Sequence, residues 1–330
     1  MKPNEHIGKV KELVNGYKNT YVLITAARIG IFTVLATKDM TVKEVAERLG
    51  YEERKIEPVL NALVHFGLIE KKNDIYSLTE YKDVLDPNSP ESQLGYINHA
   101  LNMADKWRKL EDTIKTTAVA TDNFNSITGT SYSETKAFLQ AMNTNAIPQV
   151  RFLISKYNFE GHKFIDIGAG YGTYSIEIVK KYKTAQGVAF DLPVAAQVIE
   201  ENVIEANVSD KVIVVSGNYK ENLPKDIYDD AFLFAVIHQE SEGEVEVLLK
   251  SVYDRLKKGG KLYLTSFFLD DTRTAPPFSV LFGVEMLVGS VEGHVYSYNE
   301  IQELLSKAGF ISVECVPEIP GPSTLYIAQK

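Results

Sequence analysis

The sequence predicts an α/β protein, with a mostly parallel, doubly wound sheet in its second half and a smaller helical module before it. The 330 residues are enough for about two domains. From residue 163 onward, short apolar runs alternate with helical segments, which is the signature of a doubly wound sheet. The first third instead carries apolar residues at helical spacing.

The first third predicts a winged-helix module. A helical run at residues 21–36 is followed by Thr41 and Glu44 in a capping-box pattern, with Gly50 as a helix stop. A second helical face lies within residues 51–71, and the turn at residues 73–74 separates two short strand-like runs. Two helices followed by a hairpin form the winged-helix pattern, whose usual function is DNA binding.

The charge of this module argues against DNA binding. Between Met40 and Asp86, seven basic residues stand against ten acidic ones, and the whole chain has a formal charge of −9. The second helix begins with Glu52 and Glu53, where a DNA-reading helix would present Arg, Lys or Asn. We therefore expect no nucleic-acid partner, although a ligand-sensing DNA-binding regulator stays open as an alternative.

Composition argues against several other protein classes. The chain is 45% hydrophobic, which is enough for a folded core. Cys315 is the single cysteine, so a disulfide within the chain and a cysteine-based zinc site are both excluded. The first residues lack the apolar core of a signal peptide, and the apolar segment 21–36 is shorter than the ~20 residues of a membrane span. We expect a cytoplasmic protein with no membrane partner.

The second half alternates expected strands and helices in a regular order. The break at residues 86–90 is followed by helical stretches to about residue 157, which resemble a linker region. A terminal hairpin would add an antiparallel strand to the sheet, and Cys315 falls in it as a packing residue. The expected strands are 163–168, 187–192, 211–217, 229–237, 261–268, 311–319 and 323–330, and the expected helices are 173–182, 193–206, 243–258 and 299–310.

A glycine-rich turn after the first of these strands marks a candidate nucleotide site. Gly168, Gly170 and Gly172 stand between strand and helix, where glycine permits a tight turn and close approach of a ligand to backbone N–H groups. Thr173 replaces the Gly or Ala that a dinucleotide-binding fingerprint requires. Asp191 ends the next strand and can accept hydrogen bonds from ribose hydroxyls, with helix capping as the alternative role. Together these residues favour an adenosine-type cofactor.

The motifs in their order resemble S-adenosylmethionine-dependent methyltransferases. They are FIDIGAGYG, AFDLP, VVSGNY, an apolar run ending in Ile-His, LKKGGKLYL and AGF. From about residue 10 to the end, the chain is similar to the plant caffeic-acid and bacterial antibiotic-tailoring (hydroxyindole-type) O-methyltransferases. The resemblance implies a Rossmann-like, seven-stranded methyltransferase domain with a C-terminal antiparallel hairpin, preceded by an all-α winged-helix domain.

The same resemblance implies a division of the chain into three parts. Residues 1–100 would form a winged-helix-like dimerisation domain, residues 101–155 linker helices that roof the substrate pocket, and residues 156–330 the cofactor-binding methyltransferase domain. The partners would be a second copy of the chain and a small-molecule methyl acceptor.

The cofactor implied by the resemblance is S-adenosyl-L-methionine, with S-adenosyl-L-homocysteine as its product. The family usually has Asp where Asn218 stands, and Asn still offers an acceptor for the adenine amino group. The scattered histidines imply no metal. The residues carried over are Gly168 and Gly170 at the methionine end, Asp191 at the ribose, Leu192 beside the adenine, and Asn218 and Tyr219 flanking it.

The family's catalytic histidine follows the fourth strand, where this chain has His238. With an ordinary pKa of ~6.5, histidine accepts a proton from a hydroxyl near neutral pH, which is worth roughly 10²–10⁴-fold in rate. Gln239 and Glu240 replace the usual Asp-Trp, and Ser266 and Val295 stand where the plant enzymes have glutamates that orient the histidine. A capping or solvent-facing role is the alternative for His238.

Three further residues resemble pocket-wall positions, with ordinary core packing as the alternative: Met142, Phe282 and Met286. His294 lies next to Val295 and could face the pocket, with the role of an ordinary loop histidine as the alternative. Trp107 and His99, in the middle helices, could also reach the pocket, with core or surface roles as the alternative.

The sequence thus predicts an O-methyltransferase that acts on a hydroxyl of a small, aromatic or polyketide-like molecule, with His238 as general base. An enzyme of the same fold that methylates nitrogen, sulfur or carbon, or that performs other chemistry, is the main alternative, because the two orienting glutamates are missing. A nicotinamide-dependent oxidoreductase is disfavoured by Thr173 and by the terminal hairpin.

Overall fold

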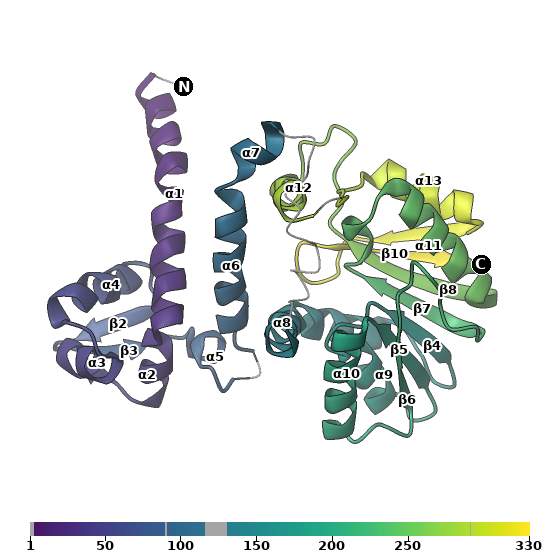
Figure 1. Cartoon of the computed structure of the whole chain (residues 1–330), viewed down its shortest axis with the longest axis horizontal. Coiled ribbons are helices and arrows are strands. Elements are labelled where there is room, and N and C mark those ends of the chain that lie inside the picture. Colours follow the sequence, from purple (N-terminus) through teal and green to yellow (C-terminus); the bar gives the residue numbers. More distant parts are fainter. Residues whose placement is uncertain (1–2, 90, 116–130, 291) are drawn as a thin grey trace. The chain divides into compact units, whose positions relative to one another are not determined.

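Figure 1 presents the computed structural model of the chain, which describes residues 3–89, 91–115, 131–290 and 292–330. The chain divides into two compact units, Met1–Ala104 and Asp105–Lys330. Each unit contains a hydrophobic core of its own, so each buries its apolar side chains independently of the other.

The first unit contains the helix-helix-hairpin order that the sequence predicts. Its three short strands form a small sheet in the order β1-β3-β2. The prediction of an all-α domain is therefore wrong in this detail, and the unit is mostly helical. The capping box at Thr41 and Glu44 is present at the start of α3. The elements are α1 (Pro3–Ile29), α2 (Ile31–Thr37), β1 (Met40–Thr41), α3 (Val42–Leu49), α4 (Glu53–His65), β2 (Ile69–Lys72), β3 (Ile75–Leu78), α5 (Lys82–Leu85) and the start of α6 (Leu94–Trp107).

The helical run predicted at residues 21–36 is two helices. Gly30 separates them in a left-handed conformation with a φ of 89°, which favours glycine because it has no Cβ atom. The half of α1 near Gly30 and the whole of α2 contribute Ile24, Ile31 and Phe32 to the core. The other half of α1 carries apolar side chains that are exposed within the described chain, namely Ile7, Val10, Leu13, Val14 and Tyr17.

The second unit contains the predicted seven-stranded sheet. Its strand order is β6-β5-β4-β7-β8-β10-β9, in which β4 to β8 pair in parallel and β10 pairs antiparallel with both β8 and β9. The terminal hairpin is therefore confirmed. The strands are β4 (Lys163–Ile167), β5 (Gln186–Asp191), β6 (Val212–Ser216), β7 (Tyr228–Phe234), β8 (Leu256–Ser266), β9 (Ser312–Val316) and β10 (Thr324–Gln329).

Helices cover both faces of this sheet. One core contains residues of α11 and α13 with Ile165 and Ile167 of β4, while the opposite core contains residues of α8, α9 and α10 with Phe164. Alternation along β4 explains the division, because successive strand residues point to opposite faces. The helices are α7 (Leu110–Lys115), α8 (Tyr132–Lys156), α9 (Thr173–Lys181), α10 (Pro193–Glu205), α11 (Glu242–Arg255), α12 (Pro277–Gly289) and α13 (Tyr298–Ala308).

Three details differ from the sequence-based expectations. The predicted helix 243–258 ends at Arg255, because Leu256 already pairs with Tyr228 at the start of β8. Helix α12 was not expected, since its almost continuous apolar sequence carries no helical period. Cys315, expected to pack in the hairpin, is exposed on β9, which forms the edge of the sheet.

No single helix of the described chain has the length and apolarity to cross a membrane. The bent pair α1 and α2 satisfies those two criteria only when both helices are counted together.

Candidate active site

The glycine turn lies between β4 and α9. Gly168, Gly170 and Gly172 have φ angles of 69°, 60° and 81°, in the left-handed region that favours glycine. A Cβ atom on Gly168 would lie 2.6 Å from Cγ2 of Val236. This turn therefore needs glycine at Gly168 for two reasons, its backbone angle and the space around it.

Asp191 ends β5 beside this turn. One carboxylate oxygen accepts a hydrogen bond from the Gly170 N–H at 2.7 Å, and the other accepts one from the Leu192 N–H at 2.7 Å. Burial raises the pKa of this carboxyl above its usual range, while both hydrogen bonds act in the opposite direction. The predicted methionine-end and ribose residues therefore meet at the carboxyl ends of β4 and β5.

This edge is also where the strand order reverses. β5 pairs with one side of β4 and β7 with the other, and ligands of doubly wound sheets bind at such a point. Asp166 lies beneath the turn, fully buried, and accepts a hydrogen bond from the Ser175 hydroxyl at 2.8 Å. Burial raises its pKa to about 7. Sequence reasoning missed Asp166, although a carboxylate inside an apolar strand is a visible signal.

The predicted adenine residues follow β6. The Gly217 N–H donates to the Asp191 carbonyl at 2.9 Å, which holds this loop against the end of β5. The side-chain oxygen of Asn218 accepts from the Lys220 N–H at 3.0 Å, and the Tyr219 hydroxyl donates to Glu240. Asn218 and Tyr219 therefore lie on the same edge of the sheet as Asp191.

His238 lies in a 3-10 turn (Ile237–Gln239) that follows β7. Ala235 directs the chain into this turn with a φ of 55°, and its N–H donates to the Thr265 carbonyl at 2.9 Å. The side chain of His238 is only 7% exposed, so the alternative of a solvent-facing residue is wrong. Burial lowers its pKa to about 4, which leaves the imidazole neutral at pH 7.

The surroundings of His238 are mostly aromatic. The Phe282 ring of α12 packs edge-on at 4.9 Å between ring centroids, and the Phe267 ring lies at 5.8 Å. Ser266, which stands at one of the two glutamate positions, places its hydroxyl 3.4 Å from Nδ1 of His238. Sequence reasoning missed Phe267, which directly follows β8.

The other predicted pocket residues lie in several elements. Met286 is buried with Val295, and Phe282 packs against this cluster. The His294 N–H donates to the His238 carbonyl at 2.9 Å, while its half-exposed ring contacts Tyr296.

Trp107 ends α6 and Met142 lies within α8, and both are half-buried. Asn143, next to Met142, accepts a hydrogen bond from Thr173, so this part of α8 lies beside the glycine turn. No group of three or more His, Cys, Asp or Glu side chains suited to a metal ion occurs among the described residues.

The O-methyltransferase domain family matches residues 102–311, and the O-methyltransferase dimerisation domain matches residues 11–85. The chain belongs to the O-methyltransferase family. It is thus an S-adenosyl-L-methionine-dependent methyltransferase.

Relatives of this O-methyltransferase align over nearly their whole length. The tetracenomycin polyketide synthesis 8-O-methyl transferase of Streptomyces glaucescens is 27% identical over 346 aligned positions, which cover 100% of this chain and 99% of the relative. The 3-hydroxy-5-methyl-1-naphthoate 3-O-methyltransferase of Streptomyces sahachiroi is 26% identical, over 92% of this chain and 90% of the relative.

Solved structures share the fold of this O-methyltransferase. The structure of PigF with SAH superposes with a TM-score of 0.89 at 21% identity, over 100% of both chains. Human N-acetylserotonin methyltransferase in complex with SAM gives a TM-score of 0.88 at 23% identity, over 100% of this chain and 98% of that one.

Proposed function

We propose that this O-methyltransferase methylates a hydroxyl of a small aromatic or polyketide-like molecule, with His238 as the general base. The observation that carries the proposal is the position of His238, buried among aromatic rings at the carboxyl edge of the sheet. The glycine turn and Asp191 lie at the same edge. A proton acceptor and a nucleotide site together are what a methyl transfer to a hydroxyl requires.

The cofactor would be held by residues that fit an adenosine group. Backbone N–H groups of the Gly168–Gly170 turn would face its methionine end, and the Asp191 oxygens keep lone pairs for ribose hydroxyls beyond the N–H groups they already accept. Leu192, Asn218 and Tyr219 would surround the adenine. S-adenosyl-L-methionine supplies a methyl group that its sulfonium sulfur already activates, and the proposal needs no metal.

His238 would work as a neutral base. Its depressed pKa keeps a ring nitrogen free of a proton at neutral pH, and Ser266 can orient the ring through Nδ1. A base of low pKa receives a proton more readily from an acidic hydroxyl than from an ordinary alcohol. We therefore expect the acceptor hydroxyl to be phenolic and acidified by conjugation.

The acceptor would be flat and largely apolar. Phe267 and Phe282 lie beside His238, and rings of this kind favour stacked or edge-on contact with an aromatic ligand. The names of two relatives specify 3-O-methylation of a hydroxynaphthoate and 8-O-methyl transfer in tetracenomycin polyketide synthesis, and acceptors of this kind fit such a pocket. Its further walls would include Trp107, Met142, Met286 and His294.

The enzyme would act as a homodimer in the cytoplasm. The dimerisation-domain match and the exposed apolar face of α1 support association through residues 1–100. Residues 116–130 of the expected linker, 101–155, lie outside the described residues. Its described parts, 101–115 and 131–155, would then roof the pocket above the methyltransferase domain at residues 156–330.

The proposal is tested by following labelled methyl groups from S-adenosyl-L-methionine into a panel of hydroxynaphthoates, hydroxyindoles and hydroxylated phenazines. NMR of each product locates the new methyl group. An O-methyl product is expected, and hydroxyls acidified by a neighbouring carbonyl should react fastest. Methylation of nitrogen, sulfur or carbon would instead support the second candidate, which the replacement of the two orienting glutamates by Ser266 and Val295 favours.

A further inference from the structure

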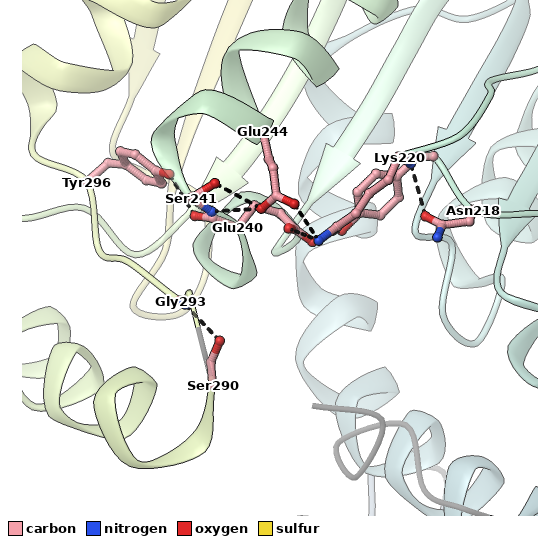
Figure 2. A network of polar contacts seen from close by, with 9 residues as sticks. Asn218, Lys220, Glu240, Ser241, Glu244, Ser290, Gly293 and Tyr296 are labelled. Atoms are coloured by element: carbon pink, nitrogen blue, oxygen red, sulfur yellow. Dashed lines mark hydrogen bonds and ion pairs between the residues drawn. The ribbon is translucent and has the colours of Figure 1, made fainter. Parts of the chain in front are cut away.

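Glu240 is a buried carboxylate that the cofactor and base assignments do not use. Its side chain is 5% exposed, at the position where the family usually has tryptophan. One carboxylate oxygen accepts a hydrogen bond from the Tyr219 hydroxyl, and the other lies 2.6 Å from Nζ of Lys220. Figure 2 draws the contact between Glu240 and Lys220. Burying a charged group is costly unless it is paired, so these contacts hold Glu240 firmly in one place.

Tyr219 and Lys220 both come from the loop that follows β6. Nζ of Lys220 also lies 2.9 Å from Glu244, whose other oxygen accepts from Ser241 in the capping box of α11. Lys220 therefore lies between two carboxylates at the start of α11, as Figure 2 shows. The loop expected to flank the adenine is thus attached to the segment that carries Glu240.

Glu240 also closes the turn that carries His238. Its N–H donates to the Ile237 carbonyl at 3.2 Å, and its own carbonyl accepts from the Tyr296 hydroxyl at 2.8 Å. The His238 carbonyl accepts from the His294 N–H. Side chain and backbone of one residue therefore join the loop after β6, the His238 turn and the segment before α13.

We propose that Glu240 is a positioning residue that couples the adenine-side loop to the His238 turn through Tyr219 and Lys220. The inference rests on the proposed function, because it assigns adenine contacts to the loop and proton transfer to the turn. Holding both in place before the ligands bind lowers the entropy lost on binding and reaction. Without Glu240, Lys220 keeps its ion pair to Glu244 but loses the one to Glu240, and the Tyr219 hydroxyl loses the carboxylate that accepts its hydrogen bond.

The test combines Glu240→Gln, Lys220→Met and the double variant. Calorimetry gives the Kd for S-adenosyl-L-homocysteine, and steady-state kinetics give kcat and the KM of the acceptor. Each single variant should weaken binding about tenfold and lower kcat with little change in acceptor KM. The double variant should bind no more weakly than whichever single variant binds more weakly, because both changes break the same ion pair between Lys220 and Glu240. Glu240→Asp should restore part of the affinity.

Lys250→Met is the matched control. Lys250 and Asp254 form an exposed ion pair on α11, with 2.8 Å between the charged atoms. Breaking this pair should leave Kd and kcat at wild-type values. Wild-type affinity in folded Glu240→Gln and Lys220→Met would overturn the proposal, as would single effects that multiply in the double variant. The Kd values do not depend on turnover. They therefore test the coupling through Glu240 even if His238 is wrongly assigned as the base.

Discussion

Gly168 shows how strictly the glycine turn depends on residue type. Gly168→Ala would place a methyl group 2.6 Å from Val236 in a left-handed backbone conformation. We expect it to lower the free energy of unfolding by about 1–3 kcal/mol and to weaken S-adenosyl-L-homocysteine binding. Chemical denaturation and calorimetry measure the two effects. Gly243→Ala, with no neighbouring atom within 4 Å, is the control, and equal losses in both variants would refute the argument.

The burial of His238 has a consequence for the pH dependence of turnover. Only the neutral imidazole can accept a proton, and its pKa is lowered to about 4. Activity should therefore stay level from pH 8 down to pH 5 and fall only near pH 4, whereas an ordinary histidine would lose activity below about pH 6.5. The measurement is kcat/KM against pH, with circular dichroism to confirm folding. A midpoint near 6.5 would contradict the buried, neutral base.

The sequence predicts single site residues correctly where they belong to a recognisable local motif. Gly168, Asp191 and His238 follow strands in a recognisable order, and their common edge follows from the parallel sheet. The pairing of His238 with Ser266 and Phe267 depends on the register of β7 and β8, which no local pattern contains. The sequence shows Glu240 only as a replacement of the family's usual tryptophan. Its contacts with Tyr219 and Tyr296 join distant parts of the chain, and only the structure shows them.

At the scale of elements, the capping-box pattern at Thr41 and Glu44 correctly predicted a helix start. The Thr41 side chain accepts from the Glu44 N–H, and Glu44 accepts from the Thr41 N–H. Thr41→Ala should destabilise the start of α3 by about 1 kcal/mol, seen as faster hydrogen exchange of its amides. Lys43→Ala, which replaces an exposed side chain on the same helix, should leave exchange unchanged. Unaltered exchange in Thr41→Ala would show that the box contributes little.

Helix ends and unpatterned helices were less predictable. Gly30, in a left-handed conformation, separates two helices although the apolar spacing of the sequence continues across it. Leu256 belongs to β8 and not to the preceding helix because it pairs with Tyr228 of β7. Helix α12 is apolar on nearly every side, so its sequence has no period that distinguishes helix from strand. In each case a tertiary contact, absent from the local sequence, decides the structure.

At the scale of the whole molecule, we predict that two copies of the chain associate through the exposed apolar side chains of α1. Val10→Glu places a charge at the centre of the exposed apolar face and should convert the dimer to single chains. Light scattering after size-exclusion chromatography measures the mass. Glu12→Gln, which removes an exposed charge from the same helix, should leave the dimer intact. A Val10→Glu protein that keeps the mass of two chains would place the dimer contact elsewhere.

We propose that His238 accepts the proton of the acceptor hydroxyl while other residues bind the cofactor. The decisive experiment measures methyl transfer by His238→Ala in a single turnover, with saturating S-adenosyl-L-methionine and the best acceptor. We predict a rate about 10²–10⁴-fold below wild type, with an unchanged Kd for S-adenosyl-L-homocysteine. A His238→Ala enzyme that transfers methyl groups at the wild-type rate would contradict the assignment.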